Sequence, residues 1–147
     1  MGRNQSTCYC ICLRRATNQI TEYYNQVLQP IGLTLNQFSL IGSLANLHTS
    51  TISELADYVG LERTTLTRTL KPLMKQGLIE DTSAPGTRSR ALCLTHAGKQ
   101  ALRQGLPLWK QAQAEVRARL GEQEAQWLYD LADKLPSRQA EHPPTVE

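Results

Sequence analysis

The alternation of apolar and polar residues predicts a chain built mainly from helices. Between Leu13 and Ile31, large apolar residues recur at the spacing of one helix face. Pro30 and Gly32 then interrupt this spacing, and both residue types commonly mark helix ends. The first element is therefore expected to be a long amphipathic helix that ends near residues 30–32.

Two capping boxes follow, and each predicts the start of a helix. In such a box a threonine and the residue three positions later satisfy each other's exposed backbone N–H groups. Thr34 with Gln37 forms the first box, and Thr51 with Glu54 forms the second. The helix after the second box is expected to be short, because Gly60 is a natural helix end.

Residues 61–77 combine an apolar stripe with a basic surface. Leu66, Leu70 and Leu73 lie at helical spacing, which predicts a helix with one face in the core. The rest of its surface carries threonines and cations: Arg63, Thr64, Thr65, Thr67, Arg68, Lys71 and Lys75. An ordinary solvated helix can have the same composition, so this segment alone does not assign a function.

A β-hairpin is expected over residues 78–94. Apolar residues begin and end this stretch, and the Ser-Ala-Pro-Gly sequence at 83–86 has the composition of a turn. Arg88 and Arg90 lie near its tip. A long helical region that Thr95 can cap follows, and a last helix is expected to end near Leu135.

Composition and charge narrow the class of protein. The chain has 147 residues, of which 40% are hydrophobic, enough for one domain with a modest core that a dimer would enlarge. No apolar run has the length of a signal peptide or a membrane helix, so we expect a cytoplasmic protein without membrane contact. The net charge of +3 conceals a gradient, since residues 1–120 carry 14 basic and 7 acidic side chains. An anionic partner is therefore expected for the basic part.

The order of the elements predicts a winged helix-turn-helix that binds DNA. A short capped helix, a basic helix rich in threonine and a hairpin with arginines near its tip follow one another, a combination that a solvated helix does not explain. A helix fits the major groove of DNA, where arginine can donate two hydrogen bonds to guanine and threonine can contact thymine. The negative potential of the minor groove attracts arginines of a slim hairpin.

These residues resemble the MarR family of transcriptional regulators over about residues 8–135. The motifs that carry the resemblance are Gly32-Leu-Thr34, Gln37-Phe38, Ile52-Ser-Glu-Leu-Ala56, Thr65-Leu-Thr-Arg68, Lys75-Gln-Gly-Leu-Ile79, Arg88, Leu92-Cys-Leu-Thr95 and Ala97-Gly98. The resemblance implies a mainly α fold with a small β-hairpin wing. It also implies a helical dimerisation region at 8–33 and 95–135 and a DNA-binding lobe at 34–94. The ends at 1–7 and 136–147 are expected to be flexible, and the polar tail has the composition of a disordered segment.

The same resemblance implies a homodimeric repressor that binds a pseudo-palindromic operator in double-stranded DNA until a ligand or an oxidant releases it. The basic helix would face the major groove, Arg88 the minor groove, and the lysines the phosphates. One departure concerns the wing, because Gly86 stands where the family typically has an aspartate two residues before the arginine. The carboxylate that would orient Arg88 is thus missing, and Arg90 is expected to share its role.

Cys8, Cys10 and Cys12 allow three interpretations. Cys10 corresponds to the reactive cysteine of a peroxide-sensing branch of the family, and the start of a helix favours a thiolate. Only Tyr24 of the three tyrosines around that cysteine has a counterpart here. The C-x-C start also resembles a subgroup with regulators of aromatic-acid catabolism, in which a small molecule is the effector. As a third interpretation, the cysteines simply pack at a dimer interface.

An effector pocket is expected at the apolar junction between the dimerisation helices and the DNA-binding lobe. Large side chains near this junction are its candidate lining, although each can equally be an ordinary core residue. These candidates are Tyr23, Tyr24, Phe38, His48 and Trp109.

No enzymatic activity and no cofactor are expected. The sequence contains no glycine-rich phosphate loop, no G-x-S-x-G elbow and no paired carboxylates. A metal site is not expected either, because the three N-terminal cysteines have no fourth ligand nearby. Two alternatives remain open, a thiol peroxidase that uses Cys10 and a helical protein-interaction module that binds an acidic partner instead of DNA.

Overall fold

The structure, a computed structural model, describes residues 8–135, so the expected flexibility of 1–7 and 136–147 concerns residues outside the described part. The chain forms two compact units, of which the first ends at Ala112 and the second begins at Gln113. The boundary falls inside helix α5 (His96–Leu120). The predicted fold class, mainly α with a small β-hairpin, is confirmed.

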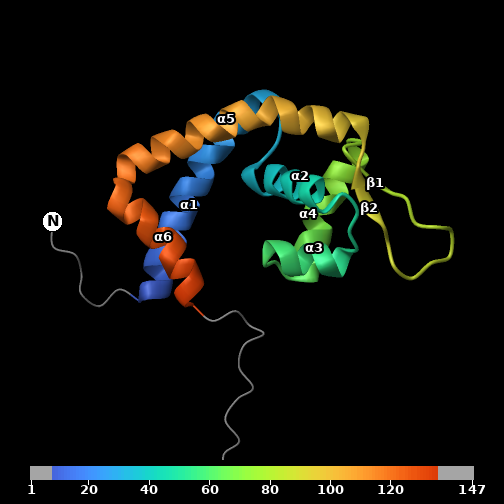
Figure 1. The fold of residues 1–147 in the computed structure, drawn as a ribbon, viewed down its shortest axis with the longest axis horizontal. Coiled ribbons are helices and arrows are strands. Elements are labelled where there is room, and N and C mark those ends of the chain that lie inside the picture. Colours follow the sequence, from blue (N-terminus) through green and yellow to red (C-terminus); the bar gives the residue numbers. More distant parts are fainter. Residues whose placement is uncertain (1–7, 136–147) are drawn as a thin grey trace, which may run out of the picture. The chain divides into compact units, whose positions relative to one another are not determined.

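The first unit contains most of the elements (Figure 1). In chain order they are α1 (Tyr9–Leu28), the 3-10 turn η1 (Gln29–Ile31), α2 (Leu35–Leu47), α3 (Ile52–Val59), α4 (Arg63–Lys75), β1 (Ile79–Asp81), β2 (Leu92–Leu94) and the start of α5. Helix α1 begins before Leu13, the first residue of its apolar pattern, and its residues up to Gln19 are exposed. Gly32, with a φ of 67°, ends η1 in the left-handed conformation that glycine tolerates.

Both predicted capping boxes are present. The Thr34 hydroxyl accepts the Gln37 N–H at 3.3 Å, and the Gln37 side chain accepts the Thr34 N–H at 3.0 Å. Thr51 and Glu54 repeat the arrangement at 3.2 and 2.8 Å. The N–H of Thr51 lowers the pKa of Glu54, because it stabilises the charged carboxylate. Gly60 ends α3 with a φ of 69°, as predicted.

One apolar cluster anchors α2, α3, α4 and the hairpin to one another. Leu66, Leu70 and Leu73, the stripe predicted for α4, are all buried in it. The other buried members are Leu28, Leu33, Phe38, Leu40, Ile41, Leu44, Leu55, Ala56, Ile79, Leu92 and Leu94. Because one face of α4 is held in this core, the opposite face is fixed toward solvent.

The hairpin has very short strands and a long loop. β1 and β2 pair antiparallel, with Asp81 opposite Leu92. Ser50, which precedes α3, extends the pairing through two backbone hydrogen bonds with Leu92 at 3.0 and 2.8 Å. These bonds fix the start of α3 beside the base of the hairpin. Residues 82–91 form the loop between the strands, which we call the wing loop.

The start of α5 lies against the base of the hairpin. Thr95 caps this helix, since its hydroxyl oxygen accepts the Gly98 N–H at 3.0 Å, while the hydroxyl donates to the Gly77 carbonyl at 2.6 Å. A Cβ atom at Gly98 would lie 2.1 Å from the Leu78 carbonyl oxygen. Only glycine allows this close approach.

The second unit consists of the end of α5 and helix α6 (Glu122–Lys134). Gly121, with a φ of 91°, separates the two helices, and Arg117 pairs with Glu122 at 2.8 Å. Trp127, Leu128 and Tyr129 of α6 are exposed. Across residues 8–135, every helix is too short or too polar to span a membrane.

Candidate nucleic-acid interface

The solvent face of α4 carries most of the residues predicted to contact DNA. Arg63, Thr64, Thr65, Arg68, Lys71 and Lys75 are exposed, whereas Thr67 is half-buried. A shallow hollow of about 350 Å³ is bordered by Arg63, Thr64, Thr67, Arg68 and Lys71, so these five side chains share one face. Within residues 8–135, Arg68 has no hydrogen-bond or ion-pair partner and is available to a ligand.

Two threonine hydroxyls of α4 are already used within the helix. Thr67 donates to the Arg63 carbonyl at 2.8 Å, and Thr69 donates to the Thr65 carbonyl at 3.1 Å. A hydroxyl that donates to its own helix keeps lone pairs that can accept a further bond. Pro72, which has no N–H, lies inside α4 after the positions that carry Thr64 to Arg68. The helix continues through it to Lys75.

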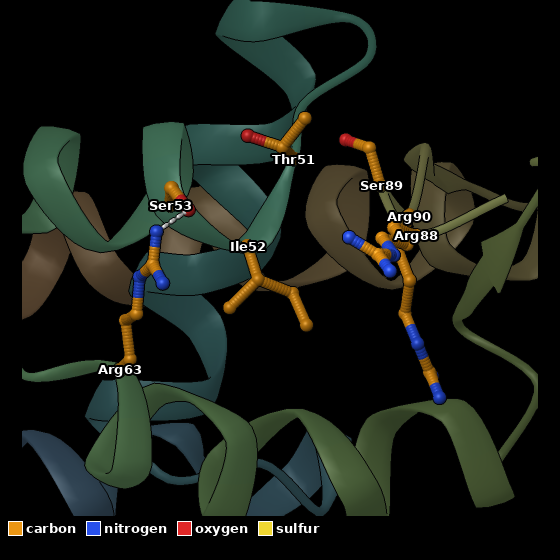
Figure 2. Close-up of a pocket in the computed structure, with 7 residues that line it drawn as sticks. All are labelled: Thr51, Ile52, Ser53, Arg63, Arg88, Ser89 and Arg90. Atoms are coloured by element: carbon orange, nitrogen blue, oxygen red, sulfur yellow. Dashed lines mark hydrogen bonds between the residues drawn. The ribbon is translucent and has the colours of Figure 1, made fainter.

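A second hollow, of about 410 Å³, opens where the starts of α3 and α4 meet the wing loop (Figure 2). Its lining residues are Thr51, Ile52, Ser53, Arg63, Arg88, Ser89 and Arg90. Figure 2 shows Arg63 on one side of Ile52 and the two wing arginines on the other. The structure thus brings the wing arginines and the first residue of α4 to the same hollow.

Three arginines line one hollow and give it a net positive charge. Arg63 donates a hydrogen bond to the Ser53 hydroxyl, and Arg90 pairs with Asp81 at 3.7 Å between Nε and Oδ2. Arg88 has no such partner among the described residues. Like charges gathered at a surface attract an anion, and here hydroxyl groups beside them can also donate hydrogen bonds. The hollow therefore suits a phosphate group or another anion.

The sequence did not identify four of the residues that line this hollow. Thr51, Ile52 and Ser53 were recognised as the start of a helix, and the last two also as part of a family motif, but none was assigned to a site, and Ser89 was not singled out. Residues at the first turn of a helix are close to whatever lies beyond its N-terminus. That position was the one available signal for Thr51 and Ser53, but the neighbouring wing loop could not be placed there from sequence.

Comparisons with known proteins match this arrangement. Residues 31–88 match the model of the MarR family. An uncharacterised HTH-type transcriptional regulator of Bacillus cereus is 30% identical over 124 residues, which cover 84% of this chain and 83% of that protein. The chain belongs to the MarR family. The predicted resemblance is confirmed, whereas the C-x-C subgroup is not, and a MarR-family protein is a DNA-binding transcriptional regulator rather than an enzyme.

Two solved structures show the same fold. The M. tuberculosis transcriptional regulator MosR in complex with DNA has a TM-score of 0.75 and 37% sequence identity, covering 88% of this chain and all of that chain. BpsR of Bordetella bronchiseptica, whose DNA binding is regulated by 6-hydroxynicotinic acid, has a TM-score of 0.79 and covers 91% of this chain and 97% of that one. Its 18% identity shows a shared fold only.

The candidate effector residues of this MarR-family chain lie in different surroundings. Phe38 is buried in the core, and Trp109 packs against the same cluster. Tyr24 is buried, and its ring meets the half-buried ring of Tyr23 edge to face at 6.3 Å between centroids. His48 is exposed at the end of α2 and does not belong to the core cluster. A pocket lined by all five side chains stays a prediction.

The N-terminal cysteines are exposed thiols at the start of α1. Cys8 precedes the helix, and Arg14 donates to the Cys10 sulfur at 3.8 Å. No group of three or more His, Cys, Asp or Glu side chains within residues 8–135 is placed to hold a metal ion. Cys93 lies half-buried on β2, where burial and the nearby Glu80 carboxylate raise the pKa of its thiol. Cys93 is therefore less reactive than an exposed thiol.

Proposed function

We propose that the protein is a homodimeric transcriptional repressor that binds a pseudo-palindromic operator in double-stranded DNA. Helix α4 enters the major groove with Arg63, Thr64, Thr65, Thr67 and Arg68. Lys71 and Lys75 contact phosphates, and Arg88 and Arg90 of the wing loop reach the adjacent minor groove. The protein acts in the cytoplasm, where it meets its operator.

The observation that carries this proposal is the exposed cationic face of α4. Its opposite face is fixed in the core by Leu66, Leu70 and Leu73, so the helix can present Arg68 without reorganisation. A preorganised helix loses less conformational entropy on binding than a mobile one. The similarity to MosR, solved in complex with DNA at 37% identity, supports a duplex as the partner.

Exposed apolar side chains near both ends of the described chain support a homodimer. Ile11 and Leu13 of α1 are 42% and 41% exposed, and Trp127 of α6 is 63% exposed. Exposed apolar residues gathered on helices mark surfaces that another protein covers. We assign residues 8–33 and 95–135 to this dimerisation region, and residues 34–94 to the DNA-binding lobe.

Selection of bound duplexes from a random pool tests the proposal. The purified protein is expected to enrich a two-fold related sequence and to bind it more weakly as salt rises. If six or more phosphates are contacted, the affinity should fall by about a thousandfold or more between about 50 and 200 mM salt. A monomer in solution, or equal affinity for any duplex and for heparin, would contradict it.

A small aromatic acid is the proposed effector, and the aromatic residues near α2 and α5 support this. Phe38 is buried in the core cluster and Trp109 packs against it, so an aromatic ring bound beside them would have apolar partners. Trp109 is then expected to change its fluorescence when an effector from a panel of aromatic acids binds, in a Trp127→Phe background that leaves one tryptophan. An unchanged spectrum together with release of DNA would place the effector elsewhere.

Thiol-based redox sensing is the second candidate, favoured by the contact between Arg14 and the Cys10 sulfur. Peroxide oxidises accessible thiols, and the Cys10 side chain is exposed to solvent. Under this alternative, peroxide releases DNA from the wild type, and Cys10→Ser abolishes the response. Peroxide release that persists in Cys10→Ser would rule out this role for Cys10.

A further inference from the structure

The carboxylate of Asp81 lies at the base of the wing loop and accepts several hydrogen bonds. Asp81 is the last residue of β1, and its Oδ1 atom accepts the Ser83 N–H at 3.0 Å and the Ser83 hydroxyl at 2.6 Å. The same oxygen lies 3.3 Å from the Ala91 nitrogen on the returning arm of the wing loop. One oxygen thus connects the outgoing and returning arms of the wing loop.

The second oxygen of Asp81 faces Arg90. Its Oδ2 lies 3.7 Å from Arg90 Nε, and the side chain of Asp81 is 23% exposed, compared with 55% for Arg90. Hydrogen bonds from Ser83, with smaller contributions from Ala91 and Arg90, lower the pKa of Asp81 because they stabilise the charged carboxylate. Because its orientation is fixed through Oδ1, the free oxygen offers Arg90 a defined position.

The wing loop itself contains no acidic residue that could orient Arg90 in place of Asp81. Residues 82–91 contain two arginines and no aspartate or glutamate, and Gly86 occupies the position of the usual family aspartate. Glu80, the neighbouring carboxylate, lies opposite Cys93 in the ladder and contacts its sulfur at 3.7 Å. Side chains of consecutive strand residues point to opposite faces, so Glu80 is directed away from Arg90.

We propose that Asp81 is a positioning residue that holds Arg90 beside Arg63 and Arg88 in the hollow and so sets the reading of DNA by the wing. This inference rests on the proposed DNA-binding function. An exposed ion pair contributes little to folding stability, so the consequence is expected in DNA recognition instead. In the free protein the Asp81 carboxylate also neutralises Arg90, which reduces the mutual repulsion of the three neighbouring arginines.

Asp81→Asn separates this role from the support of the wing backbone. The asparagine oxygen can still accept from Ser83 and Ala91, but its amide presents a donor to Arg90, which is itself only a donor. The measured quantity is the ratio of affinities for a duplex selected by the wild type and for a random duplex. We expect Asp81→Asn to lower this ratio about two- to fivefold, the range that an exposed ion pair supports.

A double-mutant cycle provides the decisive comparison. Arg90→Ala, which leaves the hydrogen bonds of Asp81 in place, should lower the ratio at least as much, and adding Asp81→Asn to it should change nothing further. Glu80→Gln is the matched control and should keep the wild-type ratio. The inference would be overturned if Asp81→Asn left the ratio unchanged. It would also be overturned if Asp81→Asn lowered the ratio equally in the wild type and in Arg90→Ala.

The same measurements distinguish failure of the inference from failure of the proposed function. If the wild type binds selected and random duplexes equally, the proposed function fails and the inference fails with it. If the wild type discriminates and Arg68→Ala weakens discrimination while Asp81→Asn does not, only the role of Asp81 is wrong.

Discussion

At the scale of single residues, His48 adopts a backbone conformation that few side chains tolerate. Its φ of 63° and ψ of −56° place it at the centre of a γ-turn, which the Thr49 N–H closes on the Leu47 carbonyl at 2.7 Å. This turn leads directly into Ser50, whose pairing with Leu92 fixes the hairpin against α3. The turn therefore contributes to the placement of the second hollow, which Thr51, Ile52 and Ser53 help to line.

We predict that His48→Gly stabilises the protein. Strain at a non-glycine residue of this kind costs about 1–3 kcal/mol, and the greater freedom of glycine in the unfolded chain offsets part of the relief. The free energy of unfolding, measured with urea, should rise by about 1 kcal/mol. His48→Ala is the control, since its Cβ keeps the strain. A loss of stability in His48→Gly would show that the imidazole makes a favourable contact.

Gly98→Ala should destabilise the first unit. Its Cβ would lie 2.1 Å from the Leu78 carbonyl oxygen, so the start of α5 would have to move away from the hairpin. A cost of about 1–3 kcal/mol in urea unfolding is expected, as for other overpacked sites. In Gly42→Ala the nearest atom would be 4.0 Å away, so this helix substitution should be neutral or slightly stabilising. Equal effects of the two substitutions would contradict the close approach.

At the scale of elements, local backbone chemistry made several helices predictable. The Thr34 and Thr51 capping boxes mark the starts of α2 and α3, and Gly60 marks the end of α3, so these bounds follow from a few neighbouring residues. The second hollow was not predictable, because Ser53, Arg63 and Ser89 are far apart in sequence and meet only through packing. The contact of Asp81 with Arg90 depends in the same way on how the two arms of the wing loop meet.

Helix α4 yields a prediction that separates base reading from phosphate binding. Arg68 lies on the solvent face near the middle of the helix, whereas Lys75 lies in its last turn. Arg68→Ala should therefore cost about 1–3 kcal/mol for the selected operator and relax its sequence preference. Lys75→Ala should weaken binding to all duplexes alike. It should also reduce, by about 1, the slope of the logarithm of affinity against the logarithm of salt concentration. Unchanged affinity in both variants would show that α4 is docked wrongly.

At the scale of the whole molecule, the proposed dimer determines what kind of operator can be bound. Two copies of α4 related by two-fold symmetry read two half-sites about one helical turn apart, roughly 34 Å. The apolar residues left exposed on α1 and α6 could be recognised from sequence only as helical stripes. Whether such a stripe packs within one chain or against a second copy depends on tertiary and quaternary structure, which periodicity does not encode.

Protection of guanine N7 from dimethyl sulfate on the selected operator tests most directly whether α4 lies in the major groove. Guanine N7 is exposed only in that groove. The account predicts two protected clusters with centres about 10 base pairs apart, and loss of protection at matching guanines of both clusters in Arg68→Ala. A bound duplex without N7 protection, with a single cluster, or with a pattern unchanged by Arg68→Ala would contradict it.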